Sequence, residues 1–148
     1  MNIENKLQKI AYETWQWICA KYGINSDSPQ IDCYKKYLPY VKRRNLFAGY
    51  VSNYDRIIIG IGLIPRYWLT YKRKGMGEYA DCIPCKKSEI IALAFIHEFT
   101  HAIQSRQGRK CYETEPIKNE IEYAREFFPH LAERLVEINS KGQIVPRD

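Results

Sequence analysis

The segment 88–107 constrains the fold of this chain more than any other, because its apolar residues recur on nearly every side of a helix. Ser88 is the predicted N-cap, Glu89 lies in the first turn, and Gly108 is placed to end the helix. A helix that is apolar all round has to be covered by other elements on all its sides. The pattern therefore predicts a helix in the middle of the fold.

Two further helices are predicted near the ends of the chain. Apolar residues spaced by three and four positions indicate an amphipathic helix over residues 4–22, with Gly23 as its C-cap. A second pattern of this kind starts at Pro116, a favourable first helical residue, and predicts a helix that continues to about residue 139.

Short strands are predicted between these helices. The runs 46–52 and 56–62 are rich in β-branched and aromatic residues and flank a turn, which is typical of a hairpin. Residues 67–71 predict a third strand, and the polar, glycine-containing segment 72–87 is expected to be a loop. With 148 residues, the chain fits a single α+β domain over 1–148, in which a small twisted β-sheet packs on the central helix.

The net charge of +6 would favour acidic partners, but the basic residues are mostly dispersed. Two short runs stand out, Lys42-Arg43-Arg44 and Lys72-Arg73-Lys74, and neither lies on a nucleic-acid-binding motif. A solvated surface is therefore favoured over nucleic-acid binding. The apolar runs are too short for a membrane span and the N-terminal residues do not resemble a secretory signal, so we expect a cytoplasmic protein.

The five cysteines cannot all be paired in disulfide bonds, because their number is odd. Cys82 and Cys85, separated by two residues, could form a small disulfide, join a metal site or do redox chemistry. A redox role expects further signals that the sequence lacks. A structural role, as a disulfide or as two buried thiols, is therefore favoured.

The chemistry-bearing pattern is His97-Glu98-Phe99-Thr100-His101, within the central helix. Histidines four residues apart project from one helix face and can bind the same ion. Glu98 lies beside them as a general base for a metal-activated water. The alternative is a pair of hydrogen-bonded core histidines, but two histidines and a glutamate are costly on so apolar a helix. The motif therefore predicts a Zn²⁺ site held by His97 and His101.

The third ligand has to come from further along the chain. The candidates are His130, the only other histidine, and the acidic residues Glu113, Glu115, Glu120, Glu122 and Glu126. With about 100° of rotation per residue, Glu120 lies at the border of the apolar face of the C-terminal helix, whereas Glu115, Glu122 and Glu126 point away from it. Glu120 is therefore the predicted ligand, followed by Glu122, because predicted boundaries shift by a few residues.

The motif at 97–101, followed by Asn119-Glu120 on a second helix, resembles the gluzincin clan of metallopeptidases, which includes thermolysin and the small minigluzincins. The resemblance implies a zincin-like fold, zinc on His97, His101 and Glu120, Glu98 as general base and acid, and peptide or protein substrates. It also implies an edge strand that pairs with an extended substrate, for which 57–61 is the natural candidate. The chain departs from the thermolysin pattern at Ala124, where an aspartate usually supports a zinc-binding histidine.

The predicted function is zinc-dependent peptide hydrolysis, in which a further donor such as Tyr112 or Tyr123 would stabilise the oxyanion. Two alternatives stay open. A catalytically silent zincin scaffold could bind protein or nucleic acid through its basic surface, and a metal-dependent hydrolase could act on another substrate class. Retention of Glu98 favours an enzyme, because a purely structural site needs no base.

Overall fold

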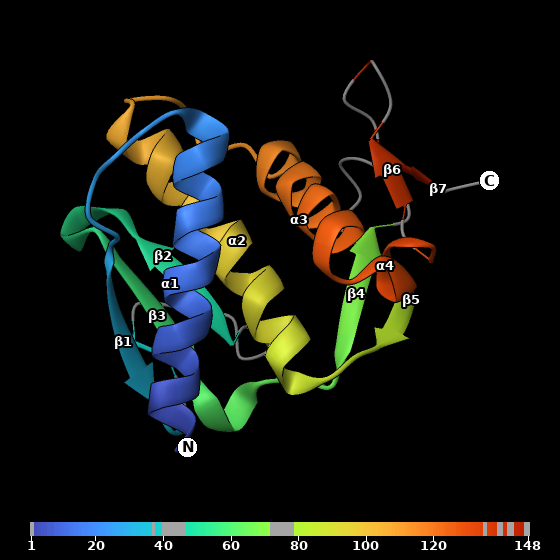
Figure 1. The fold of residues 1–148 in the computed structure, drawn as a ribbon, viewed down its shortest axis with the longest axis horizontal. Coiled ribbons are helices and arrows are strands. Elements are labelled where there is room, and N and C mark those ends of the chain that lie inside the picture. Colours follow the sequence, from blue (N-terminus) through green and yellow to red (C-terminus); the bar gives the residue numbers. More distant parts are fainter. Residues whose placement is uncertain are drawn as a thin grey trace.

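The computed structural model of the chain describes residues 2–36, 38–39, 47–71, 79–134, 136–138, 141 and 144–146. Its helices and strands are, in chain order, α1 (Ile3–Tyr22), β1 (Gln30–Tyr34), β2 (Ala48–Val51), β3 (Arg56–Gly60), β4 (Tyr67–Tyr71), β5 (Tyr79–Pro84), α2 (Lys87–Arg106), α3 (Thr114–Phe127), α4 (Pro129–Ala132), β6 (Val136–Ile138) and β7 (Ile144–Pro146). Helices and small sheets thus form a mixed α+β fold, as the sequence predicts (Figure 1).

Helix α2 lies in the middle of the molecule, as its apolar surface predicts (Figure 1). It contacts α1 on one side, α3 on another and β2 on a third. Phe95, Ile96, Phe99 and Ile103 are each at most 2% exposed, so α2 carries the largest side chains of the core on several of its faces. Packing of these large side chains therefore fixes how α2 is rotated in the fold, and with it the direction in which the histidine motif faces.

The predicted ends of the first two helices are largely confirmed. Gly23 ends α1 in the left-handed conformation, with φ of 64°. Gly108 has the same conformation just beyond α2. The predicted cap at Ser88 is wrong, because α2 begins one residue earlier and Ser88 lies inside it. The carboxylate of Glu89 caps this end instead, accepting a hydrogen bond of 2.7 Å from the Lys86 backbone N–H.

The first sheet has the strand order β1-β3-β2. Strands β2 and β3 form the predicted antiparallel hairpin, and β1 lies parallel to β3 on its other side. The buried isoleucines Ile57, Ile58 and Ile59 are explained by this central place, since both faces of β3 are covered. The expectation that 57–61 is a substrate-pairing edge strand is therefore wrong. Among the described strands, β2 is the edge strand that contacts α2.

Strand β4 confirms the strand predicted at 67–71, but it pairs with β5 in a separate two-stranded sheet. The expectation of a loop throughout 72–87 is therefore wrong for residues 79–84. The polar and glycine content of the segment suggested a loop, whereas the backbone of β5 is held by its antiparallel partner, as tertiary context overrides local preference. Cys82 lies within β5, and Cys85 follows it as a free, half-buried thiol whose pKa burial raises to about 11. Burial thus disfavours the thiolate form of this cysteine.

The predicted C-terminal helix is too long. Helix α3 ends at Phe127, a short α4 follows, and β6 pairs with β7 where the helix was expected to continue. The break lies at Pro129, which has no backbone N–H and disfavours a helical residue before it. Phe128 accordingly lies outside the helical region, with φ of −133° and ψ of 59°. The apolar spacing continued across the proline, but the helix could not.

In the described part of the chain, no helix is long and apolar enough to cross a membrane. The two basic runs, Lys42-Arg43-Arg44 and Lys72-Arg73-Lys74, lie outside the described residues. The N-terminal half of α3 lies beside α2, so that two acidic residues of this region, Glu113 and Glu120, come close to the histidine motif.

Candidate metal centre

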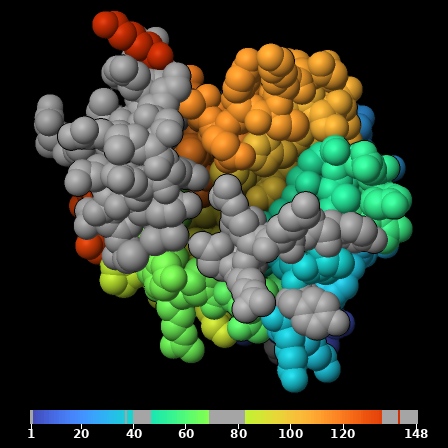
Figure 2. Space-filling view, turned by 180° about the vertical axis from the view of Figure 1, so that it is seen from behind, coloured from blue at the N-terminus to red at the C-terminus, as the bar shows by residue number. Residues whose placement is uncertain are grey.

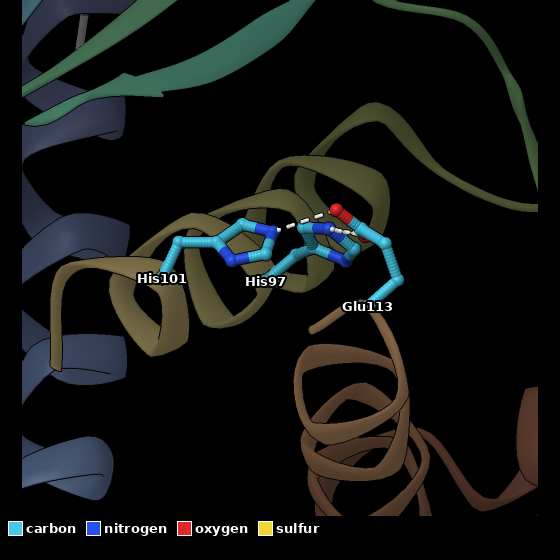
Figure 3. A group of neighbouring side chains, drawn as sticks. All are labelled: His97, His101 and Glu113. Atoms are coloured by element: carbon cyan, nitrogen blue, oxygen red, sulfur yellow. Dashed lines mark ion pairs between the residues drawn. The ribbon is translucent and has the colours of Figure 1, made fainter. Parts of the chain in front are cut away.

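His97 and His101 lie one turn apart on α2 and face the start of α3 (Figure 3). Their rings are 4.9 Å apart between centroids and inclined by 74°. Both side chains are mostly buried, at 18% and 11% exposure. The helix thus presents two imidazoles to one point, as their spacing predicts.

The residue at that point is Glu113, which precedes the first turn of α3 (Figure 3). One carboxylate oxygen lies 2.9 Å from Nε2 of His97, and the other lies 3.1 Å from Nε2 of His101. Ligand atoms of the three side chains all lie within 4.8 Å of one another. Two imidazole nitrogens and one carboxylate oxygen are the donor set of a catalytic zinc site, so these residues fit the predicted metal.

The Nδ1 atoms of the two rings face different acceptors. Nδ1 of His97 lies 2.7 Å from a carboxylate oxygen of Glu120, and Nδ1 of His101 lies 2.8 Å from the amide oxygen of Gln104. Each Nδ1 is therefore the nitrogen that carries the hydrogen and donates it. In a neutral ring the lone pair is then left on Nε2, which is the atom that faces Glu113.

Glu120, the predicted third ligand, lies on the Nδ1 side of His97. Its second carboxylate oxygen accepts a hydrogen bond of 3.1 Å from the indole Nε1 of Trp68 on β4. The residue is 9% exposed, as its place at the border of the apolar helix face predicts. Its two oxygens thus accept from two donors, one of them a histidine of the motif.

Gln104 connects His101 to the segment that carries Glu113. Its amide oxygen faces the His101 ring, while its amide nitrogen donates to the Tyr112 carbonyl at 3.1 Å. The side chain is fully buried. Gln104 was not predicted from the sequence, although a glutamine three positions after His101, among apolar residues of the same helix, was a signal that could have identified it.

Glu98 follows His97 on α2 and is half-buried. Burial raises the pKa of Glu98, and the charges of His97 and His101 oppose this increase without cancelling it. A carboxylate with a raised pKa is better suited to accept and return a proton than an ordinary surface glutamate. The structure thus places Glu98 directly beside the two histidines, with a pKa above its usual value.

The charges of the neighbouring side chains His97, His101 and Glu113 change one another's pKa values. Burial lowers the pKa of His97, but the charge of Glu120 and the hydrogen bond to Glu113 outweigh it and raise the pKa well above its usual value. For His101, burial again lowers the pKa, but the hydrogen bond to Glu113 outweighs this effect, so that the pKa is raised above its usual value. Burial raises the pKa of Glu113, yet its two histidine partners hold it far below the usual range. Protons and a metal ion therefore compete for the same ring nitrogens.

Thr100 and Asn119 join α2 to α3 beneath this group. The Asn119 amide nitrogen donates to Thr100 Oγ1 at 2.9 Å and to the Tyr22 hydroxyl at 2.8 Å. The Tyr22 hydroxyl in turn donates to Glu115, which also accepts two hydrogen bonds from Arg109. This network, buried at Thr100 and Asn119 and exposed at Arg109, joins the first turns of α3 to α1 and α2 next to Glu113.

Replacing Asn119 by alanine is expected to lower the free energy of unfolding by about 1–3 kcal/mol, because buried hydrogen-bond partners lose their donor. The change is measured by urea denaturation followed by circular dichroism. Lys118→Ala, at the exposed neighbouring position, is the matched control and should stay within about 0.5 kcal/mol of the unchanged protein. Equal stabilities of the two variants would contradict the role of this network.

The other candidates lie elsewhere. Glu122 forms an ion pair with Lys21, Glu126 accepts from the Trp17 indole at 2.9 Å, and His130 lies 2.6 Å from Glu89 at the far end of α2. Tyr123 packs its ring against Trp17, Phe127 and Phe128, so it belongs to the interface of α1 and α3. Tyr112 is 62% exposed next to Glu113.

Comparisons with known proteins add no assignment. No protein-family model matches the sequence, and neither a curated protein nor a solved structure is significantly similar to the chain. The function has to be argued from the geometry of the site itself.

Proposed function

We propose that this protein is a zinc-dependent peptidase of zincin-like architecture. The observation that carries the proposal is the convergence of the His97 and His101 Nε2 atoms on one carboxylate, with Glu98 beside them. A structural metal site has no use for a base next to its ligands, whereas a hydrolytic site requires one. This is why the enzyme is favoured over a catalytically silent scaffold.

Different residues of the site would have different roles in hydrolysis. His97 and His101, with an acidic residue from the α3 region, would hold the ion, which when bound lowers the pKa of a water molecule and polarises the scissile carbonyl. The Glu98 carboxylate accepts a proton from the attacking water and returns it to the departing amine. Glu120 and Gln104 keep the two rings oriented through their Nδ1 atoms.

Strand β2 is the part of the fold suited to hold an extended peptide. The Gly60 N–H donates to the Phe47 carbonyl at 2.7 Å, so the backbone groups of Ala48 and Tyr50 point away from β3 in the alternating antiparallel pattern. Figure 2 shows the gold atoms of α2 set back between the orange atoms of α3 and the blue-green atoms of β2. A peptide added to this edge would run beside the helix that carries the histidines.

The proposal is tested by metal analysis and by hydrolysis of casein and of a peptide library. We expect about one equivalent of zinc per chain, cleavage that stops when a chelator removes the metal, and recovery on adding zinc. Stoichiometric zinc without cleavage of any peptide would favour the scaffold, and cleavage that survives complete metal removal would contradict the mechanism. Turnover of a non-peptide ester or amide alone would indicate a different hydrolase.

A further inference from the structure

We propose that Glu113 supplies the third metal ligand and that Glu120 is a positioning residue, which holds His97 in its ligating orientation. The inference rests on the proposed metal site, and it deepens that proposal by dividing two nearby carboxylates into different roles. It also departs from the family resemblance, which implies that Glu120 binds the metal.

The Nε2 atoms of the two histidine rings both face Glu113. An imidazole presents its two ring nitrogens on different sides, and one ion shared by two rings has to lie where the two lone pairs meet. Both Nδ1 atoms are occupied by hydrogen-bond acceptors, Glu120 for His97 and Gln104 for His101. The Nε2 atoms are the ones that converge, and the carboxylate of Glu113 meets both of them.

Both carboxylate oxygens of Glu120 are already engaged in hydrogen bonds. Its oxygens already accept from His97 Nδ1 and from the indole nitrogen of Trp68, which can only donate. To reach an ion on the Nε2 side, this buried carboxylate would have to give up both bonds and leave the Trp68 donor without its partner. A carboxylate behind a ligating histidine is the usual arrangement that fixes the ring and raises its basicity.

The two histidines are supported in the same way. Gln104 does for His101 what Glu120 does for His97, and both supporting side chains are anchored by a second bond, to Tyr112 and to Trp68 respectively. Glu113, by contrast, is 59% exposed and lies at the end of a loop. Its position leaves the side chain free to follow an ion without disturbing the core, which a buried residue cannot do.

The test measures zinc affinity by competition with a chromophoric chelator and the visible absorption of the cobalt(II)-substituted protein. Three variants are compared with the unchanged protein: Glu113→Gln, Glu120→Gln and Glu120→Ala. Glu122→Gln, which changes a half-buried α3 carboxylate paired with Lys21, is the matched control. None of these measurements requires turnover of a substrate.

We expect Glu113→Gln to weaken zinc binding by more than about a hundredfold and to change the cobalt spectrum, because an anionic ligand is lost. Glu120→Gln should weaken zinc binding by about 10–100-fold and keep the spectral envelope, since the ligands are unchanged. Glutamine can still accept from His97, so Glu120→Gln should bind zinc more tightly than Glu120→Ala. An unchanged cobalt spectrum in Glu120→Gln is the result that distinguishes a positioning residue from a metal ligand.

The opposite pattern would overturn the assignment: an altered cobalt spectrum in Glu120→Gln and an unaltered one in Glu113→Gln. Should Glu120→Ala fail to fold, Trp68→Phe replaces it, because that change removes only the donor behind Glu120 and should weaken zinc binding without altering the cobalt spectrum. A wild type that binds zinc and cleaves peptides while Glu113→Gln keeps its affinity would refute this inference alone. A wild type that binds no metal would refute the proposed function as well.

Discussion

Replacing Glu98 by glutamine is expected to lower peptidase activity by about 10²–10⁴-fold while the protein keeps its zinc. Glutamine has nearly the same shape as glutamate but cannot accept a proton from water at neutral pH. The residue lies next to His97 without being one of the three side chains whose ligand atoms converge. Loss of the base should therefore be visible in kcat, with the metal content unchanged.

This result is measured as kcat and KM on the best peptide found in the library, together with zinc per chain by elemental analysis. Glu122→Gln serves as the control again, because it removes a glutamate that lies in an ion pair with α1. It should retain the activity and the zinc of the wild type. Full activity in Glu98→Gln would exclude Glu98 as the base, and loss of zinc there would assign it to the ligand set instead.

Phe99→Ala is expected to lower the free energy of unfolding by about 3–5 kcal/mol, the usual cost of a buried phenylalanine. The ring is fully buried, stacks on Phe95 with centroids 5.5 Å apart, and meets the edge of Trp15 at 5.1 Å. Its removal leaves a cavity between α1 and α2, which a small protein can hardly close. Such a loss is a large fraction of the total stability of a typical domain.

The measurement is a urea titration of the metal-free protein, so that zinc binding does not add to the stability. Tyr12→Ala is the control, because this aromatic residue of α1 is 68% exposed and its removal should change the stability by no more than about 0.5 kcal/mol. A loss below about 1 kcal/mol in Phe99→Ala would show that this side of α2 is not packed as described.

The loss of activity in Glu98→Gln and the loss of stability in Phe99→Ala concern adjacent residues of α2, of which Glu98 is half-buried and Phe99 is fully buried. Phe99 lies between the two histidines in the sequence, yet its ring points into the core, while His97 and His101 face α3. The different directions of Phe99 and the two histidines follow from the helical period alone. The positions of the two histidines and of Glu98 on one central helix could therefore be predicted from the sequence.

The direction of Glu120 could be predicted as well, because its phase on an amphipathic helix places it at the border of the buried face. The ring nitrogen of His97 that Glu120 contacts could not be predicted. Whether this carboxylate meets the Nε2 or the Nδ1 side of His97 depends on where α3 lies along α2, and no period within either helix encodes that offset. The hydrogen bond from Trp68 depends in turn on β4, which lies far away in the sequence.

The sequence by itself determined the elements whose signal is local: α1 and α2 with their glycine ends, the β2–β3 hairpin, and two imidazoles one turn apart on an apolar helix. Only the tertiary structure decided that β3 is central, that residues 79–84 form a strand, and that Glu113 faces the Nε2 atoms. The physical reason is the range of the interactions. Helix phase and turn chemistry act over a few residues, whereas strand pairing and the meeting of side chains from different elements depend on packing across the whole chain.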